Sequence, residues 1–306
     1  MKILVGYSGF VGSNLILQTN FEGLFNSKNI KESYGSNPDI LVYSGVSATK
    51  FLANENEKID FKQIEMAINN IKLINPKKLI LISTIDVYSN SMGVNEDTFI
   101  NRDFLQPYGK NRYYLEEWVR ENIKDYTIIR LPALYGKNLK KNFIFDLIKI
   151  VPSLLRYDKY EELAHKSLYI KKAYEKINDD FYKCIIEDKE FLKKLKQEFI
   201  SLRFTALNFT DSRSCFQFYN LNNLWNHILI GIENNFPTIN MATEPVVVSE
   251  LYKYIFNKDF KNELDKPILK YNFYTKYADS FNGKNGYIFS KKYVLDDVKK
   301  YVEKNL

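Results

Sequence analysis

A threonine, a tyrosine and an arginine have the types and spacing needed to transfer a proton. Tyr108 and Arg112 stand four residues apart in an expected helix, so they share one helix face. A phenol has a pKa of about 10 in water, and a nearby cation favours its ionised form, which makes it a usable general acid or base. Thr84 ends an apolar, strand-like run, and its hydroxyl could hold a substrate oxygen beside Tyr108. We therefore expect Thr84, Tyr108 and Arg112 to be the catalytic residues.

Three glycines near the start of the chain predict a site for a dinucleotide. The sequence Gly-Tyr-Ser-Gly-Phe-Val-Gly follows a short apolar run and opens a helical pattern. The first glycine allows a tight turn, the second lets backbone N–H groups approach a pyrophosphate, and the third lets the helix lie close to the strand. The helix N-terminus adds unpaired N–H groups and the positive end of a dipole. The expected cofactor ligands in this turn are Gly6, Ser8, Gly9, Phe10, Val11 and Gly12.

The end of the second expected strand should select between NAD and NADP. An acid there would bind a ribose hydroxyl and repel a 2′-phosphate. This segment instead reads Asn26-Ser27-Lys28, in which the hydroxyl and the cation suit a phosphate. Glu32 is the rival candidate, but we place it beyond the strand. NADP is therefore the preferred cofactor and NAD the alternative, unless Lys28 is only a solvated surface residue.

The elements that must position these residues alternate along the first half of the chain. Apolar runs predict strands, helical spacing predicts the segments between them, and the almost pure Leu/Ile run at 78–83 is typical of a central parallel strand. Alternating strands and helices predict a Rossmann-like, doubly wound parallel α/β sheet. The expected strands are 2–5, 23–26, 39–43, 78–83 and 126–131, and the expected helices are 10–19, 60–74 and 107–122.

The second half of the chain has a different character. Residues 142–200 contain no glycine and show helical periodicity. We expect residues 1–140 to form the NAD(P)-binding Rossmann domain. Residues 141–306 should form a smaller, mostly helical substrate-binding part, with some chain returning to the sheet near 205–240.

Composition excludes several classes of protein. The 306 residues are 45% hydrophobic, which excludes a disordered chain and allows a real core. The net charge of +7 comes from lysines interspersed with glutamates, and no basic block carries interleaved aromatics, so nucleic acid is an improbable ligand. No apolar run could span a bilayer. Two cysteines and two well-separated histidines favour neither a disulfide framework nor a zinc site. We expect a reduced, cytoplasmic, metal-free protein.

Several segments together resemble the extended short-chain dehydrogenase/reductase family. They are the first strand with its glycine turn, the run Ser83-Thr84-Ile85-Asp86-Val87-Tyr88, the Tyr-x-x-x-basic helix, and Arg130-Leu131-Pro132-Ala133-Leu134-Tyr135-Gly136. The family contains NAD(P)-dependent nucleotide-sugar epimerases, dehydratases and 4-ketoreductases. The resemblance covers the first 140 residues or so well, by the position of these motifs, and it is weak beyond them.

The resemblance assigns roles to further residues. It implies proton chemistry for Thr84 and Tyr108 and a cofactor site that also includes Ser44, Gly45, Ser83, Arg112 and Leu131. It also implies that Arg213 meets the nucleotide pyrophosphate. Asp86, Tyr135 and Asn142 are expected to contact substrate. The alternatives are a loop-anchoring carboxylate for Asp86 and ordinary core or surface positions for the other two.

One departure from the family affects the chemistry. The family pattern is Tyr-x-x-x-Lys, whereas this chain has Arg112 in place of the lysine. Arginine keeps the charge and can still hold a ribose, but it cannot release a proton to relay one. Lys110 is a poor substitute because it points to another helix face. On this basis Arg112→Lys should retain or raise activity.

The resemblance implies an NAD(P)H-dependent oxidoreductase acting on a nucleotide-linked sugar, most simply by reducing a keto-sugar carbonyl. The run Thr84-Ile85-Asp86 lacks the complete acid pair of the dehydratases. The first alternative is an epimerase that uses the same hydride step. An alternative of another class is a catalytically weak NAD(P)-binding sensor or partner protein. The family also implies a role in polysaccharide biosynthesis and a homodimer formed through two helices, one of which follows Tyr108.

Overall fold

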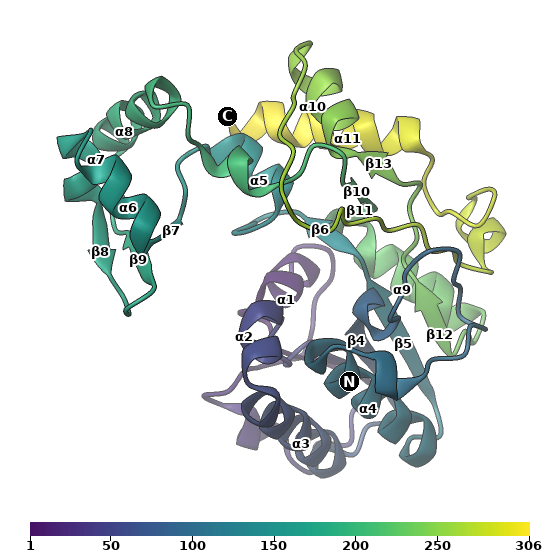
Figure 1. Ribbon diagram of the computed structural model, residues 1–306. Coiled ribbons are helices and arrows are strands. Elements are labelled where there is room, and N and C mark those ends of the chain that lie inside the picture. Colours follow the sequence, from purple (N-terminus) through teal and green to yellow (C-terminus); the bar gives the residue numbers. More distant parts are fainter. The chain divides into compact units, whose positions relative to one another are not determined.

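A parallel sheet of six strands organises the chain, whose computed structural model describes residues 1–306 (Figure 1). The strand order is β12-β5-β4-β3-β1-β2, and every neighbouring pair is parallel. The strands are β1 (Lys2–Val5), β2 (Gly23–Phe25), β3 (Ile40–Tyr43), β4 (Lys78–Thr84), β5 (Tyr126–Leu131) and β12 (Thr238–Asn240). The expected Rossmann-like, doubly wound α/β fold is confirmed.

Successive side chains of these strands enter two different hydrophobic cores. Leu4 and Ile80 belong to one core, whereas their neighbours Ile3 and Leu79 belong to the other. Because alternate residues of a strand point to opposite faces, the sheet is buried on both. Helices α1 (Phe10–Leu15) and α9 (Leu224–Glu233) pack into the first core, and α3 (Glu57–Ile74) and α4 (Pro107–Asn122) pack into the second.

The order of the strands marks where a ligand would bind. Strand β1 lies between β2 and β3, so the chain crosses from one side of β1 to the other. In open parallel sheets such a switch point opens a site at the carboxyl ends of the strands. The loops that follow β1, β3 and β4 therefore share one edge with the short helix α2 (Lys50–Glu55).

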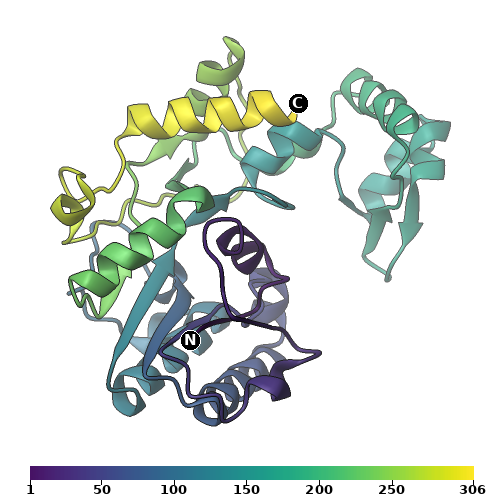
Figure 2. The same ribbon diagram turned by 180° about the vertical axis from the view of Figure 1, so that it is seen from behind.

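Chain distant in sequence completes the sheet. The green segment that carries α9 and β12 lies beside β5 in both views (Figures 1 and 2). Two more strands pair in parallel next to it, β6 (Ala133–Tyr135) and β11 (Phe218–Asn220). A second short pair joins β10 (Cys215–Phe216) to β13 (Val246–Val247).

One expected helix is shorter than its pattern predicted. Helix α1 ends at Leu15, although apolar spacing extended the expectation to residue 19. Residues 16–19 form turns instead, in which the Thr19 amide donates to the Leu15 carbonyl at 3.2 Å. The Gln18 side chain leaves the helix and donates to the Leu221 carbonyl at 2.9 Å. Contacts with distant chain therefore replace the last helical turn.

The chain forms two compact units. The first comprises Met1–Leu139, Cys215–Val246 and Leu269–Asp297, and the second comprises Lys140–Ser214, Val247–Ile268 and Val298–Leu306. The long helix α11 (Lys291–Asn305) contributes to both. The division into a cofactor part and a substrate part remains a prediction.

The second unit contains strands that the helical periodicity of 142–200 did not predict. Its helices are α5 (Phe143–Lys149), α6 (Tyr157–Ala164), α7 (Leu168–Ala173), α8 (Lys189–Ser201) and α10 (Val248–Phe256). Between them lies an antiparallel sheet of β7 (Leu154–Arg156), β9 (Phe181–Cys184) and β8 (Tyr174–Lys176). These strands are too short for alternation to stand out from helical spacing. Tyr160 and Tyr182 stack at 3.7 Å and help to tie the sheet to α6.

No helix of the chain has both the length and the apolar composition needed to cross a bilayer. Six short 3-10 helices complete the chain: η1 (Ile30–Ser33), η2 (Ile85–Val87), η3 (Arg102–Phe104), η4 (Ala206–Phe209), η5 (Leu221–Asn223) and η6 (Ala278–Phe281).

Candidate active site

The three glycine positions of the first turn differ in backbone conformation and in the room they leave for a side chain. Gly6 has a φ of +89°, and a side chain there would lie 2.5 Å from the Ser44 carbonyl oxygen. A Cβ on Gly12 would collide with the Gly6 backbone. Gly9 is exposed, has an ordinary φ of −76°, and its Cβ would meet only the Gly6 carbonyl oxygen at 3.2 Å. The fold therefore requires Gly6 and Gly12, whereas a side chain at Gly9 would need the Gly6 carbonyl oxygen to move by a few tenths of an ångström.

Such a turn suits a dinucleotide. Gly9 is exposed, and its missing side chain leaves the amides of the turn open to a pyrophosphate. Ser8 is exposed beside it, with its hydroxyl 3.4 Å from the Asn26 side-chain nitrogen. Phe10 and Val11 pack against the first hydrophobic core and anchor the turn from below. The residues present fit the cofactor that the sequence predicted.

The loop after β2 presents its polar atoms in an ordered form. The Asn26 side-chain oxygen accepts from the Lys28 amide at 2.9 Å, and the Asn29 side-chain oxygen accepts from the Asn26 amide at 2.8 Å. Ser27 and Lys28 are both exposed at the tip. Glu32, the rival residue, lies outside the strand in η1. The loop thus offers a hydroxyl and a cation, and the strand end carries no acid.

Gly109 lets Tyr108, the expected general acid, lie close to Thr84. A side chain at Gly109 would collide with the Asp86 carbonyl oxygen, so only glycine lets the first turn of α4 pack onto η2. Tyr108 precedes it and is 7% exposed. The Thr84 hydroxyl accepts from the Asp86 amide at 3.2 Å and is hydrogen-bonded to the Tyr108 phenol. Thr84 and Tyr108 therefore lie close together, their catalytic roles remain a prediction, and the role of Gly109 was missed.

Burial controls the ionisation of Tyr108. Removal from water raises its pKa above the ordinary value, and the charge of Asp86 acts in the same direction. Arg112, the Thr84 hydrogen bond and Lys50 act in the opposite direction without reversing the shift. The expectation that the cation on its own helix would lower this pKa is therefore wrong for the net effect. Tyr108 is a protonated phenol at neutral pH and thus a proton donor.

Arg112 is committed to the protein. Its guanidinium pairs with Asp60 of α3, and both side chains are only 5% exposed. It also donates to the carbonyl oxygens of Ser47, at 2.5 Å, and of Tyr108, at 3.3 Å. The guanidinium carbon lies 4.0 Å from the centre of the Tyr108 ring. These contacts fix the ring, and a bond from Arg112 to a ribose remains a prediction.

A second cation reaches the site from another element. The Lys50 ammonium, at the start of α2, lies 2.8 Å from the Asp86 carboxylate. The Tyr271 hydroxyl donates to the same carboxylate oxygen at 3.4 Å. Burial alone would lower the pKa of Lys50, but Asp86 and Tyr271 raise it above its ordinary value, so the amine is charged. Sequence reasoning missed Lys50 and Tyr271 because nothing near them forms a motif.

The two hydroxyl residues at the end of β4, Ser83 and Thr84, point to opposite faces of the sheet. Ser83 donates to the fully buried Glu116 of α4 at 2.6 Å, on the side of the sheet opposite to Thr84. Arg130 pairs with the same carboxylate at 2.6 Å. Burial would raise the pKa of Glu116, but Arg130 and Arg120 hold it below its ordinary value. Ser83 therefore positions α4, and its contact with a cofactor remains a prediction.

The other predicted cofactor residues are placed as follows. The Ser44 hydroxyl donates to the Val5 carbonyl at 2.9 Å, which joins the loops after β1 and β3. Gly45 is exposed at the same edge, and a Cβ there would lie 3.0 Å from the Val5 side chain. Leu131 is 4% exposed and belongs to the hydrophobic core. Asn14, which was not predicted, holds α1 by accepting from the Lys137 amide at 3.0 Å.

The predicted substrate residues are divided between the two units. Asp86 lies beside Tyr108 and Lys50. Tyr135 is 1% exposed, and its hydroxyl donates to Asp297 at 2.5 Å, so it is part of the interior. Asn142 and Arg213 belong to the second unit. There Asn142 caps α5, and Arg213 pairs with Asp211 at 2.7 Å.

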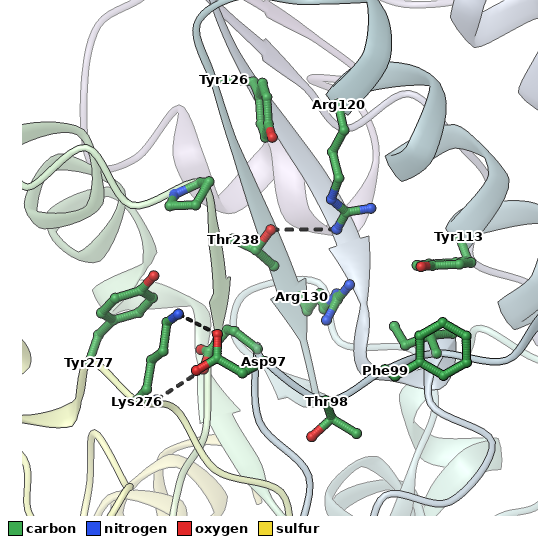
Figure 3. A pocket seen from close by; sticks show the side chains of 13 residues that line it. Asp97, Thr98, Phe99, Tyr113, Arg120, Tyr126, Arg130, Thr238, Lys276 and Tyr277 are labelled. Atoms are coloured by element: carbon green, nitrogen blue, oxygen red, sulfur yellow. Dashed lines mark hydrogen bonds and ion pairs between the residues drawn. The ribbon is translucent and has the colours of Figure 1, made fainter.

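A cavity of about 290 Å³ opens elsewhere in the first unit (Figure 3). Arg120, Arg130 and Thr238 point into it from α4, β5 and β12, and Lys276 lies at its edge. None of the predicted site residues lines it. Its charged side chains have partners within the protein, such as Lys276 with Asp97 and Arg120 with Glu116. The predicted site residues lie at the carboxyl edge of the sheet, outside this cavity.

Comparisons with known proteins give matches only at the level of structure. No protein-family model and no curated protein sequence matches the chain. UDP-glucose 4-epimerase from Thermotoga maritima, solved with UDP-glucose, is 15% identical, aligns over 99% of this chain and 98% of its own, and has a TM-score of 0.62.

Two structures with bound NADP or NADPH are equally similar. dTDP-4-dehydrorhamnose reductase from Bacillus anthracis, in complex with NADP, is 16% identical over 100% of this chain and 99% of its own, with a TM-score of 0.63. RMD from Pseudomonas aeruginosa, complexed with NADPH, is 12% identical over 100% and 99%, with a TM-score of 0.62.

These structures define the class of fold. The chain shares the fold of these epimerase and reductase structures over its whole length, which confirms the Rossmann-like α/β fold that the sequence predicted. The Thr84–Tyr108 pair lies at the carboxyl edge of the sheet, where this fold places ligands.

Proposed function

We propose that this protein is an NAD(P)H-dependent oxidoreductase that reduces the keto group of a nucleotide-linked sugar. The contact between Thr84 and the buried Tyr108, on the same sheet edge as the glycine turn, carries the proposal. A bound nicotinamide cofactor would supply the hydride. The chain would orient the sugar oxygen through Thr84 and donate a proton to it from Tyr108.

The protonated phenol supports reduction. Reduction of a ketone needs a proton donor at the oxygen, and Tyr108, whose pKa burial raises above its ordinary value, carries its proton at neutral pH. The structures of dTDP-4-dehydrorhamnose reductase with NADP and RMD with NADPH support the same assignment. The similar fold of the UDP-glucose 4-epimerase makes epimerisation the second candidate.

The choice of NADP over NAD rests on the loop after β2. Ser27 and Lys28 are exposed at its tip, and the backbone bonds of Asn26 and Asn29 hold that tip in place. A cation and a hydroxyl suit the extra 2′-phosphate of NADP. The residues that would hold the rest of the cofactor are those of the glycine turn.

The second unit, with Asn142 and Arg213, would bind the nucleotide-sugar substrate. Arg213 offers a cation for a diphosphate, although Asp211 and Glu263 already pair with it. We place the enzyme in the cytoplasm and in polysaccharide biosynthesis, because nucleotide-linked sugars are the ligands of its structural neighbours.

A homodimer through α3 and α4 is also part of the proposal. Leu115 and Val119, two α4 residues expected at such an interface, are buried in the sheet core. The exposed apolar face lies instead on α3, where Ile59, Met66 and Leu73 recur every seven residues and are each more than two-fifths exposed.

The groove between the two helices supports a second copy of this chain as the occupant. It has a volume of about 330 Å³ and is lined by Phe61, Tyr114 and Trp118 together with Glu65 and Lys72, on another face of α3 than Met66. A second copy related by a two-fold axis could pair its acidic residue with the basic residue of the first.

The function is tested by assaying NADPH consumption with a panel of dTDP- and UDP-linked keto sugars. We expect turnover by the natural chain and a decrease of about 10²- to 10⁴-fold in Tyr108→Phe, because the variant loses its proton donor. NADPH binding, followed by its fluorescence, should be unchanged in that variant. Tyr113→Phe removes a hydroxyl from the same helix outside the site and should retain activity. Equal turnover by Tyr108→Phe would refute the assignment, and NADPH binding without turnover would favour the sensor alternative.

A further inference from the structure

The cation that the Tyr-x-x-x-Arg motif provides is held in a buried ion pair. Arg112 forms a buried ion pair with Asp60, and Asn111 donates to the same carboxylate at 2.8 Å. A guanidinium so bound holds α4 against α3. Because it is paired and cannot release a proton, Arg112 leaves the phenol without the mobile cation that a lysine would give.

Lys50 brings an ammonium to the same place from α2. It contacts Asp86 at 2.8 Å, and Asp86 in turn lies against the first turn of α4 through Gly109. The Lys50 side chain is 45% exposed, so it remains in contact with water, whereas Asp86 is 21% exposed. The Asp86 carboxylate therefore accepts hydrogen bonds from the Lys50 ammonium and the Tyr271 hydroxyl.

We propose that Lys50 takes over the part of the missing motif lysine as a positioning residue: it balances Asp86 beside Tyr108, so that the phenolate formed after proton donation is stabilised. The inference rests on the proposed function for its use in turnover, but the coupling of Lys50 to the phenol exists without cofactor or substrate.

Every charged or titratable group that acts on Tyr108 enters this balance. Burial raises the pKa of Tyr108 most, and Asp86 from η2 raises it further. Arg112 from its own helix and Lys50 from α2 lower it, as does the hydrogen bond from Thr84. Tyr271 acts through Asp86, and Asp60 acts through Arg112.

The coupling is tested on the free protein by 19F NMR of Tyr108→3-fluorotyrosine, since fluorination brings a phenol into an accessible titration range. In the added Lys50→Met background we expect the midpoint to rise by about one pH unit, or to leave that range, because a neighbouring cation is worth about that much. Asp86→Asn should move the midpoint down. Lys50→Arg keeps the charge and should restore the wild-type midpoint.

Lys110→Met is the matched control. Lys110 stands two residues from Tyr108 but pairs with Glu57 at 3.2 Å, on another face. It should leave both the midpoint and the turnover unchanged. A midpoint that does not move in Lys50→Met, or that moves equally in Lys110→Met, would overturn the proposal.

The activity assay separates this proposal from the proposed function. With an active keto sugar, Lys50→Met should lower kcat about tenfold and shift the alkaline limb of the pH profile upward, with KM nearly unchanged, since one pKa unit corresponds to a tenfold change. A shifted 19F midpoint in a protein that turns over no sugar would refute the reductase and leave the Lys50 coupling intact. An active reductase in which Lys50→Met shifts neither the 19F midpoint nor the pH profile would support the proposed function and refute the Lys50 coupling.

Discussion

At the scale of single residues, the contacts of Arg112 give it a structural role. The sequence presents it as a substitute for a catalytic lysine. The structure shows a guanidinium that is 5% exposed and joins Asp60 to the Ser47 carbonyl oxygen. Its planar set of donors serves several acceptors at once, which a single ammonium cannot do. The residue beside the phenol that still has an amine is Lys50.

Arg112→Lys is therefore expected to lower stability. Lysine can keep the pair with Asp60 but leaves a carbonyl acceptor without its donor, at a cost of about 1–3 kcal/mol. Urea unfolding measures this loss. Arg102→Lys, at an exposed pair with Glu117, should change the free energy of unfolding by less than about 0.5 kcal/mol. Equal stability of Arg112→Lys and the natural chain would contradict the role given to the guanidinium, whereas retained activity stays a separate prediction.

Lys28→Glu tests the choice of cofactor at the tip of the loop after β2. Replacing an exposed cation by an anion should weaken the binding of NADPH by about tenfold or more and change the binding of NADH little. The reason is that only NADPH carries the 2′-phosphate. Fluorescence titration with both cofactors gives the ratio. Lys31→Glu, on the neighbouring η1, makes the same charge change and should preserve the ratio. An unchanged preference in Lys28→Glu would argue against the phosphate site.

At the scale of elements, the approach of α4 to η2 decides whether the site exists. Thr84 closes β4, and Tyr108 opens α4, with a long irregular segment between them. They meet because Gly109 lets the helix backbone touch the Asp86 carbonyl. The buried Glu116 then holds the same helix to β4 and β5 through Ser83 and Arg130.

Gly109→Ala should separate these two elements. The added methyl group has no room against backbone, so we expect a loss of stability of about 1–3 kcal/mol or more and a large loss of turnover. Thermal unfolding and the reductase assay report the two effects. Lys110→Ala changes the next residue, which is exposed, and should preserve both. Normal stability in Gly109→Ala would mean that α4 does not need this contact.

At the scale of the whole molecule, the exposed apolar face of α3 predicts that two chains associate. Met66 is 61% exposed at the middle of this face. Met66→Lys would bury two charges across a two-fold interface, so it should convert a dimer of twice 36.1 kDa into monomers. Light scattering gives the mass directly. Met92→Lys, at a 44% exposed methionine outside α3, should remain dimeric. A natural chain that is already a monomer would refute the interface.

Local patterns in the sequence determined the sheet, the glycine turn and the threonine–tyrosine pair. Apolar runs such as that of β4 report burial on both faces, and the glycine turn between strand and helix is set by the close approach of its own backbone. Each of these patterns involves residues close together in the sequence, so it can be recognised in a single sequence.

Only the tertiary structure decided which charges stand beside the phenol. Arg112 is four residues from Tyr108 and lowers its pKa, but Asp60, from a different helix, holds the guanidinium in a buried ion pair. Lys50, Asp86 and Tyr271 meet across three separate segments of chain, and no spacing in the sequence records that meeting. Burial, which sets the sign of the Tyr108 pKa shift, is likewise a property of everything packed around the ring, and for that reason the motif alone gave the wrong sign.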